Sequence, residues 1–116
     1  MSQFMMLLVE DDPLQREVFA DLLKGEGFEV VECTTAEAAE LVIATSGLEF
    51  RAAVVDQNLD GHMLGSELAA FACKMFPRLN FVLMSGNAPP PHLPQRIRFL
   101  RKPFQPEDLL TAVRAI

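Results

Sequence analysis

Residues 52–67, AAVVDQNLDGHMLGSE, are compatible with two different folds. A calcium-loop pattern, D-x-[DN]-x-[DN]-G-x5-E, is satisfied at every required position, namely Asp56, Asn58, Asp60, Gly61 and Glu67. A loop of that kind lies between two helices. The residues before Asp56, however, form the apolar, β-branched run AAVVD, which is typical of a buried strand that ends in a carboxylate. The neighbouring sequence therefore has to decide between them.

Composition limits the classes of protein to consider. The chain has 116 residues, half of them apolar, which predicts one domain over residues 1–116 with a proper core. A net charge of −6 disfavours nucleic-acid partners, which need clustered Lys and Arg. The longest apolar run, residues 4–9, is far shorter than the ~20 residues of a membrane helix. Cys33 and Cys73 lack a metal-binding spacing, so we expect free thiols and a soluble, cytoplasmic protein without a membrane partner.

Short β-type runs alternate with stretches of helical period along the whole chain. The apolar run FMMLLVE at residues 4–10 predicts a strand buried on both faces. A helix should follow, with Asp12 as its cap, Pro13 at its first position and Gln15 closing a capping box. Its apolar positions recur every four residues at Leu14, Val18 and Leu22, and Gly25 and Gly27 end it.

The same alternation continues to the end of the sequence. Further strands are expected at residues 28–33, 52–56, 80–85 and 96–102. The helices between them should begin with a Thr34–Glu37 capping box and run to about Ala44, span about 65–75, and start near Pro106 and run to the C-terminus. The proline-rich segment 88–94 predicts an extended, polyproline-like crossover instead of a helix. Five strands joined in this way predict a doubly wound parallel α/β sheet with helices on both faces.

Polar side chains stand where the predicted strands end. They are Glu10 and Asp11 after the first strand, Asp56 after the third, Ser85 after the fourth and Lys102 after the fifth. In open parallel sheets, function collects beyond the carboxyl ends of the strands. Clustered carboxylates repel one another unless a cation joins them, and hard oxygen ligands suit Mg²⁺. A lysine and a hydroxyl nearby would then hold an anion such as a phosphoryl group.

These segments resemble the receiver domains of two-component response regulators. The resemblance covers nearly the whole chain, through LLVEDDP (7–13), VVDQNLDG (54–61), LMSGN (83–87), FLRKPF (99–104) and PEDLL (106–110). It implies a flavodoxin-like α/β fold with strand order 2-1-3-4-5, in which the Pro-rich loop shortens or replaces the fourth helix. It also implies a phosphoacceptor in a histidine-to-aspartate phosphorelay, with a histidine kinase or phosphotransfer protein as partner, and not an enzyme in the usual sense.

The resemblance assigns roles to individual residues. Asp56 matches the phosphoacceptor, whose carboxylate forms an acyl phosphate. Glu10 and Asp11 match the acidic pair that holds Mg²⁺ with Asp56 and the backbone carbonyl of Asn58. Lys102 matches the lysine that pairs with the phosphoryl oxygens.

A conformational switch is implied as well. Ser85 matches the hydroxyl that turns toward the phosphoryl group, and Phe99 matches the aromatic that moves inward when it does. The peptide bond before Pro103 is expected to be cis. Because the sequence stops at Ile116, directly after the last predicted helix, we expect no output domain within it.

Two other functions stay open. The first is a protein-interaction module of the same fold that works without phosphorylation. The second is an EF-hand-like calcium binder at residues 56–67, which would require Glu67 as a ligand. Among the remaining polar residues, Asp12 is interpreted as a helix cap, Asp60 and Gly61 as a turn, and His62 and His92 as loop residues.

Overall fold

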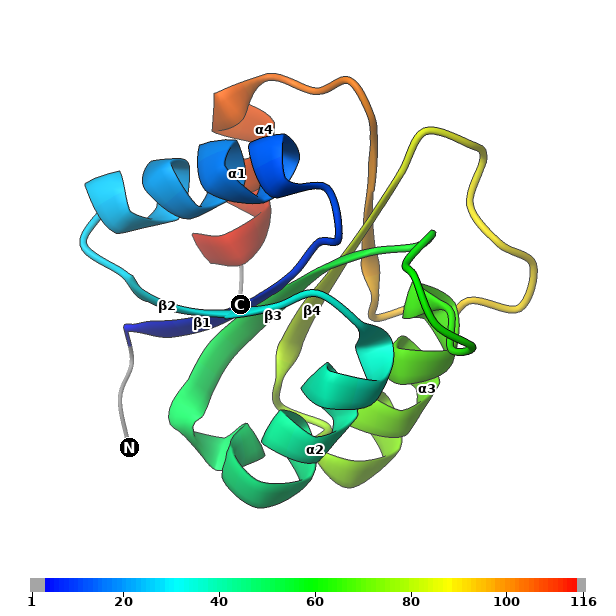
Figure 1. Ribbon diagram of the computed structural model, residues 1–116. Helices are drawn as coiled ribbons and strands as arrows, with labels where there is room; N and C mark the ends of the chain where they lie inside the picture. Colours follow the sequence, from blue (N-terminus) through cyan, green and yellow to red (C-terminus); the bar gives the residue numbers. More distant parts are fainter. Residues whose placement is uncertain (1–3, 115–116) are drawn as a thin grey trace.

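The computed structural model describes residues 4–114. Its elements in chain order are β1 (Met5–Val9), α1 (Pro13–Gly25), β2 (Glu29–Cys33), α2 (Ala36–Ser46), the 3-10 turn η1 (Gly47–Glu49), β3 (Phe50–Asp56), α3 (Gly65–Met75), β4 (Asn80–Ser85), β5 (Arg98–Arg101) and α4 (Pro106–Arg114). The strands form one sheet in the order β2-β1-β3-β4-β5, with every neighbouring pair parallel. Helices α1 and α4 cover one face of the sheet, and α2 and α3 cover the other (Figure 1). The expected α/β fold and strand order are confirmed.

Alternating residues of each central strand supply two separate cores. In β1, Leu7 and Val9 point into the core under α2 and α3, whereas Met6 and Leu8 point into the core under α1 and α4. All four side chains are fully buried. A strand buried on both faces cannot alternate apolar with polar residues, which explains the continuous apolar runs in the sequence.

The register of the sheet brings the carboxyl ends of its central strands to one edge. Val9 pairs with Val55, Asp56 with Met84, and Ser85 with Arg101. Residues that follow these strands therefore emerge side by side. The register of the strands therefore places the predicted polar residues next to one another at the carboxyl edge of the sheet.

Helix α1 departs from the predicted pattern in its buried face but keeps the predicted cap. Its buried residues are Phe19, Ala20 and Leu23, while Leu14 is 75% exposed and Val18 is 56% exposed. The predicted recurrence is therefore wrong at Leu14 and Val18, although its third member, Leu22, is partly buried against the core. Phe19 and Leu23 form an equally regular pair and mark the buried face. Asp12 does cap the helix, since its Oδ1 accepts hydrogen bonds from the amides of residues 14 and 15.

Both predicted capping boxes are wrong in detail. The backbone amide of Asp12 donates to Glu10 Oε2 (3.3 Å), so Gln15 does not close the first box. Helix α2 is capped by Thr35, whose Oγ1 accepts from the amide of residue 38, and not by Thr34. Glu37 is drawn away from the helix end because its carboxylate binds backbone amides of the loop after β3.

The chain between β4 and β5 contains no helix, as the prolines predicted. It is not uniformly extended, because it turns at residues 91–92, where His92 has φ 63°, and again at 95–96. Strand β3 begins two residues earlier than expected, at Phe50, which pairs with Met5, and β5 is shorter at both ends than expected. The last helix is described to Arg114, and its predicted course to the C-terminus lies outside the described residues. None of the helices within residues 4–114 is long and apolar enough to span a membrane.

Candidate functional site

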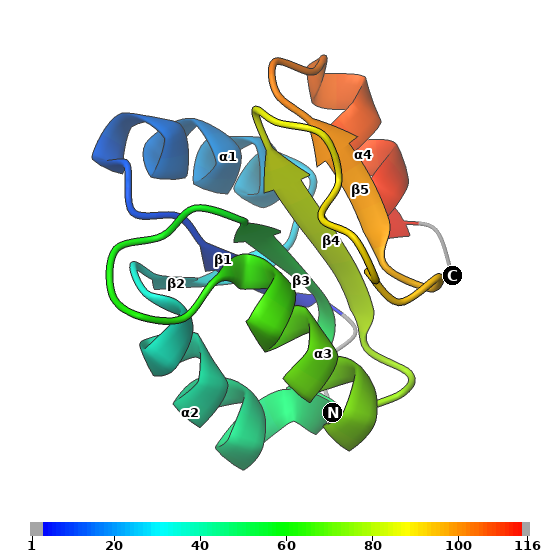
Figure 2. The same cartoon turned by 90° about the vertical axis from the view of Figure 1, so that its right-hand side faces the viewer.

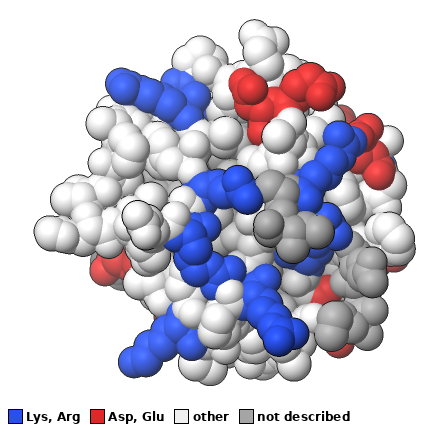
Figure 3. Space-filling view, turned by 180° about the vertical axis from the view of Figure 1, so that it is seen from behind, with Lys and Arg blue, Asp and Glu red and all other residues white. Residues whose placement is uncertain are grey.

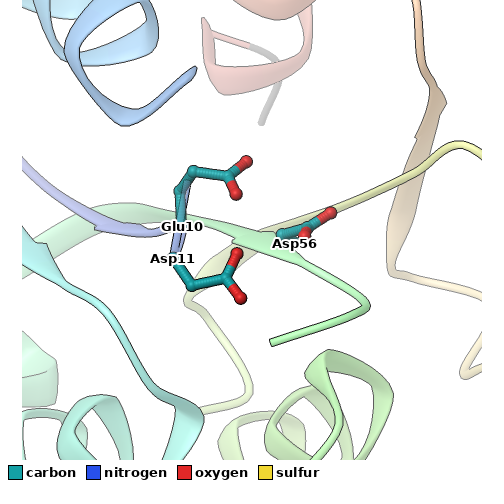
Figure 4. Close-up of side chains that lie close together, drawn as sticks. All are labelled: Glu10, Asp11 and Asp56. Atoms are coloured by element: carbon teal, nitrogen blue, oxygen red, sulfur yellow. The ribbon is translucent and has the colours of Figure 1, made fainter. Parts of the chain in front are cut away.

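Three carboxylates meet at the carboxyl edge of the sheet. Glu10 and Asp11 directly follow β1, and Asp56 is the last residue of β3. One oxygen from each carboxylate lies within 4.8 Å of the others, close enough for all three to hold a single metal ion. Figure 4 shows the carboxyl groups of Glu10 and Asp11 extending from the end of β1 toward the end of β3, where Asp56 lies. Glu10 is 1% exposed and Asp56 is 7% exposed, so water screens their charges poorly.

Lys102 supplies the positive charge in this cluster. Its Nζ lies 2.9 Å from Glu10 Oε1 and 3.2 Å from Asp56 Oδ1, and it donates to Gln15 Oε1 at 2.6 Å. The peptide bond between Lys102 and Pro103 is cis. The backbone amide of Lys102 also donates to the carbonyl oxygen of Ser85 (2.8 Å), which fixes the lysine beside the acids.

Burial governs the protonation of the cluster. It raises the pKa of Asp56, and the opposing effect of Lys102 only partly offsets that rise, while the Asp11 charge adds to it. Burial likewise raises the pKa of Glu10 against the effect of Lys102, and the charge of Asp56 adds to it. One ammonium group therefore does not compensate three carboxylates, and the site favours a further cation.

The loop after β3 is held at two points, one in the site and one on helix α2. The backbone amide of Asp60 donates to Asp11 Oδ2 (3.0 Å). Glu37 Oε2 accepts from the amides of His62 (2.8 Å) and Met63 (3.1 Å), and these bonds lower the pKa of the Glu37 carboxyl. The loop that follows Asp56 is thus held by one site carboxylate and by helix α2.

The start of α3 lies close to the backbone of Asp56. A Cβ atom on Gly65 would lie 2.4 Å from the Asp56 carbonyl oxygen and 2.9 Å from Leu83 Cδ1. Gln57 adds a side-chain clamp, accepting from the Ser66 amide (2.7 Å) and donating to Ser66 Oγ (3.0 Å). Only glycine permits this approach, and it positions α3 against the end of β3.

The calcium-loop interpretation of residues 56–67 does not fit this geometry. The residues before Asp56 form strand β3 and not the helix that such a loop requires. Glu67 Oε1 accepts from the backbone amide of Leu64 (2.8 Å) at the start of α3. Glu67, the last acidic position of the calcium-loop pattern, therefore caps the start of α3.

The other residues with predicted roles lie in different surroundings. Ser85 is 1% exposed, and its Oγ accepts from the amide of Asn87 (3.1 Å). Asn58 is exposed in the loop after Asp56. Phe99 is half-buried and packs against the core under α2 and α3. His62 and His92 are exposed in loops, as expected.

Two residues of the site had no predicted role there. Gln15 accepts from Lys102 and donates through Nε2 to Asp12 Oδ2 (3.3 Å), which links the lysine to the start of α1. Arg16 Nη1 donates to the Glu10 carbonyl oxygen (3.1 Å). Their position in the first turn of α1, beside the acidic pair, is the only signal in the sequence that could have indicated these contacts.

The chain belongs to the response regulator receiver domain family, which matches residues 6–114. Receiver domains act in two-component signal transduction as phosphoacceptors, and the acidic cluster of this chain is consistent with a phosphorylation site that can hold a metal ion.

Individual relatives agree with this membership. The chain is 34% identical over 112 residues to the response regulator protein FleR of Pseudomonas aeruginosa, covering 92% of this chain and 23% of FleR. It therefore spans about a quarter of that relative's length. Among solved structures, a CheY-like receiver domain protein from Methanospirillum hungatei has a TM-score of 0.83 at 26% identity, and a receiver protein from Sinorhizobium medicae has 0.83 at 24%. Each comparison covers 95% of this chain and 90% of the other.

Proposed function

We propose that Asp56 accepts a phosphoryl group from a phosphohistidine on a histidine kinase or phosphotransfer protein. The observation that carries this proposal is the placement of the Asp56 carboxylate, which lies at a strand end beside two further carboxylates and a lysine. Asp56 is 7% exposed, so its carboxylate contacts little bulk water but remains accessible to a donor at the edge of the sheet.

In the transfer, the protein contributes one covalent step, the attack of Asp56 on phosphorus. An Asp56 carboxylate oxygen forms a bond to phosphorus, the bond from phosphorus to the donor's imidazole nitrogen breaks, and the electron pair returns to that nitrogen. Lys102 lies 3.2 Å from Asp56 Oδ1, so its charge stands beside the oxygen atoms that gain the phosphoryl group. Positioning and charge compensation are the contributions of the protein.

The residues present fit a magnesium ion. Hard carboxylate oxygens from few protein ligands suit Mg²⁺, and Glu10, Asp11 and Asp56 supply three. The backbone carbonyl of Asn58 would be the fourth protein ligand. When bound, the ion would neutralise charge on the transferring group and help to orient it. The raised pKa values of Glu10 and Asp56 support this requirement for a cation.

Ser85 and Phe99 are the proposed switch residues. The Ser85 hydroxyl now accepts from the Asn87 amide, an interaction that it would exchange for the phosphoryl group. Phe99 is half-buried, so an inward movement would gain apolar burial. The phosphoryl group would then shift the population between two arrangements. Free Cys33 and Cys73 support a cytoplasmic location for this chemistry.

Intact mass spectrometry after incubation with Mg²⁺ and acetyl phosphate tests the proposal. Wild type and Asp60→Asn, a control in the exposed loop, should gain one phosphoryl group, whereas Asp56→Asn should gain none. Binding of Mg²⁺ without phosphorylation, including in the presence of a phosphorylated phosphotransfer protein, would favour the phosphorylation-independent module. Selective binding of Ca²⁺ that is lost in Glu67→Gln would favour the calcium binder.

A further inference from the structure

The loop between β3 and α3, residues 57–64, runs beside the start of helix α2 (Figure 2). Its two ends are fixed, because the Gly65 amide donates to the Gln57 carbonyl oxygen (3.0 Å) and the Gln57 amide donates to the Met84 carbonyl oxygen (2.8 Å). Asn58, whose backbone carbonyl is the proposed fourth metal ligand, lies inside this loop. The path of the loop therefore determines where that carbonyl group lies.

Glu37, in the first turn of α2, holds the middle of the loop. Its Oε2 accepts hydrogen bonds from the amides of His62 (2.8 Å) and Met63 (3.1 Å). Its Oε1 is buried and has no hydrogen-bond partner among the described residues. Gly61 has φ 101°, and a Cβ atom on it would lie 2.8 Å from that Oε1, so a larger residue would be strained there and would press against the carboxylate. The loop thus fits closely around the Glu37 carboxylate.

Backbone amides, and not lysines or arginines, bind this carboxylate. Within residues 4–114, no Lys or Arg lies in ion-pair distance of Glu37. Figure 3 shows Lys and Arg gathered across the middle of the side that faces away from the viewer in Figure 1. Hydrogen bonding, first of all from the His62 amide, lowers the pKa of the Glu37 carboxyl and so favours its ionised form. Hydrogen bonds to an ionised acceptor are roughly twice as strong as neutral ones, which suits Glu37 to fixing a loop.

The same loop reaches the acidic cluster through Asp60. The Asp60 amide donates to Asp11 Oδ2 (3.0 Å), and Asp60 forms an isolated β-bridge with Thr35, the residue that caps α2. Only Gly61 separates Asp60 from the two amides that Glu37 binds. Contacts therefore run from Glu37 through the loop backbone to a carboxylate of the proposed metal site.

We propose that Glu37 is a positioning residue for this metal site, which sets its affinity and selectivity for Mg²⁺ without binding the ion itself. By fixing residues 60–63, Glu37 keeps the Asp60 amide on Asp11 and limits the positions open to the Asn58 carbonyl. Mg²⁺ demands near-ideal octahedral geometry, whereas Ca²⁺ accepts irregular ligand sets. A loop held in one conformation therefore favours Mg²⁺. The inference rests on the proposed function, because it requires a cation at the acidic cluster.

Titration of the full chain with Mg²⁺, followed through its backbone amide NMR signals without a phosphodonor, tests this role. Glu37→Ala should weaken Mg²⁺ binding about tenfold, the lower end of the range for groups that orient metal ligands. Glu37→Gln keeps an oxygen acceptor and loses the charge, so it should weaken binding less, by about threefold. Glu40→Ala removes the same charge elsewhere on α2. It should change the Kd by less than about twofold in about 0.15 M salt, which screens distant charges.

Two further measurements separate positioning from a general loss of stability. In Glu37→Ala, Ca²⁺ affinity should fall less than Mg²⁺ affinity, so the preference for Mg²⁺ over Ca²⁺ should fall by about threefold or more. Hydrogen exchange at the Asp60 amide should also become faster, because the loop no longer keeps that amide on Asp11. Circular dichroism should show that each variant is folded. If Glu37→Ala does not fold, Glu37→Gln carries the same comparisons, with the smaller changes expected for it.

Three results would overturn the inference while leaving the proposed function intact. They are equal Mg²⁺ affinity in wild type and Glu37→Ala, an equal loss of Mg²⁺ affinity in Glu37→Ala and Glu40→Ala, and an equal loss of Mg²⁺ and Ca²⁺ affinity in Glu37→Ala. In each case, wild type would still bind Mg²⁺ and gain a phosphoryl group from acetyl phosphate. A wild-type protein that does not bind Mg²⁺ would instead overturn the proposed metal site, and the role of Glu37 with it.

Discussion

Replacing Asp56 by asparagine should stabilise the protein in the absence of Mg²⁺. One carboxylate oxygen each of Glu10, Asp11 and Asp56 lies within 4.8 Å of the other two, and at 4.8 Å a pair of charges repels by about 3 kcal/mol at an effective dielectric constant of about 20. Asp56→Asn removes two of these repulsions and one attraction to Lys102 at 3.2 Å, worth about 5 kcal/mol on the same scale. Including relief from burying a charge, the net gain should be on the order of 2 kcal/mol at pH 7.

The pH dependence has a defined sign. Because burial raises the pKa of Asp56, the native protein binds more protons than the unfolded chain between the ordinary value of about 3.9 and the raised value. The free energy of unfolding of wild type should therefore fall as pH rises through that window. The gain in the free energy of unfolding from Asp56→Asn should be complete above this pH window and absent below it.

Urea unfolding at several pH values, with and without Mg²⁺, measures these effects. Asp21→Asn, at an exposed position on α1, is the control and should change stability by less than about 0.5 kcal/mol. Saturating Mg²⁺ should stabilise wild type, by about 2.7 kcal/mol at one hundred times its Kd, and Asp56→Asn much less. A destabilised Asp56→Asn variant at pH 7 without Mg²⁺, or a gain that does not depend on pH, would refute this electrostatic account.

Three other outcomes are expected. Gly65→Ala should lower the free energy of unfolding by about 1–3 kcal/mol in urea, because its Cβ would lie 2.4 Å from the Asp56 carbonyl oxygen; an unchanged midpoint would show that α3 shifts freely. Thr35→Ala should cost about 1 kcal/mol through loss of the α2 cap, while Thr34→Ala should cost little, and the reverse order would contradict the observed cap. Glu37→Ala should speed hydrogen exchange at the two loop amides that the Glu37 carboxylate binds. These hydrogen bonds lower the pKa of Glu37, so in wild type the protection of the two amides should be lost as pH falls through that lowered pKa.

Local sequence predicted the strands and helices well, because their signals are local. The apolar run at residues 4–10 and the proline cluster at 88–94 act through burial and backbone geometry that neighbouring residues determine. The order of polar residues at strand ends also indicated which side chains would meet. Parallel strands bring such ends together whatever the rest of the chain does.

Contacts between distant residues account for the errors. The Thr34–Glu37 box failed because Glu37 binds loop amides 25 and 26 residues away. The role of Gln15 was missed because its partner Lys102 lies 87 residues further along the chain. Similarly, which face of α1 is buried depends on Phe104, whose ring stacks on Phe19 with 5.6 Å between the ring centroids. Local patterns carry no information about such partners.

All three N–H donors of the Lys102 ammonium group have acceptors. It carries three N–H bonds, and three acceptors surround it, namely Glu10, Asp56 and Gln15. Any anion that binds to this group must displace one of them. Gln15 is the neutral partner and holds the lysine without opposite charge, so it is the one most readily released. Because Gln15 also binds the cap residue Asp12, its departure would loosen the first turn of α1. Anion binding at the sheet edge would thereby affect a helix, because the Lys102 nitrogen carries only three N–H bonds.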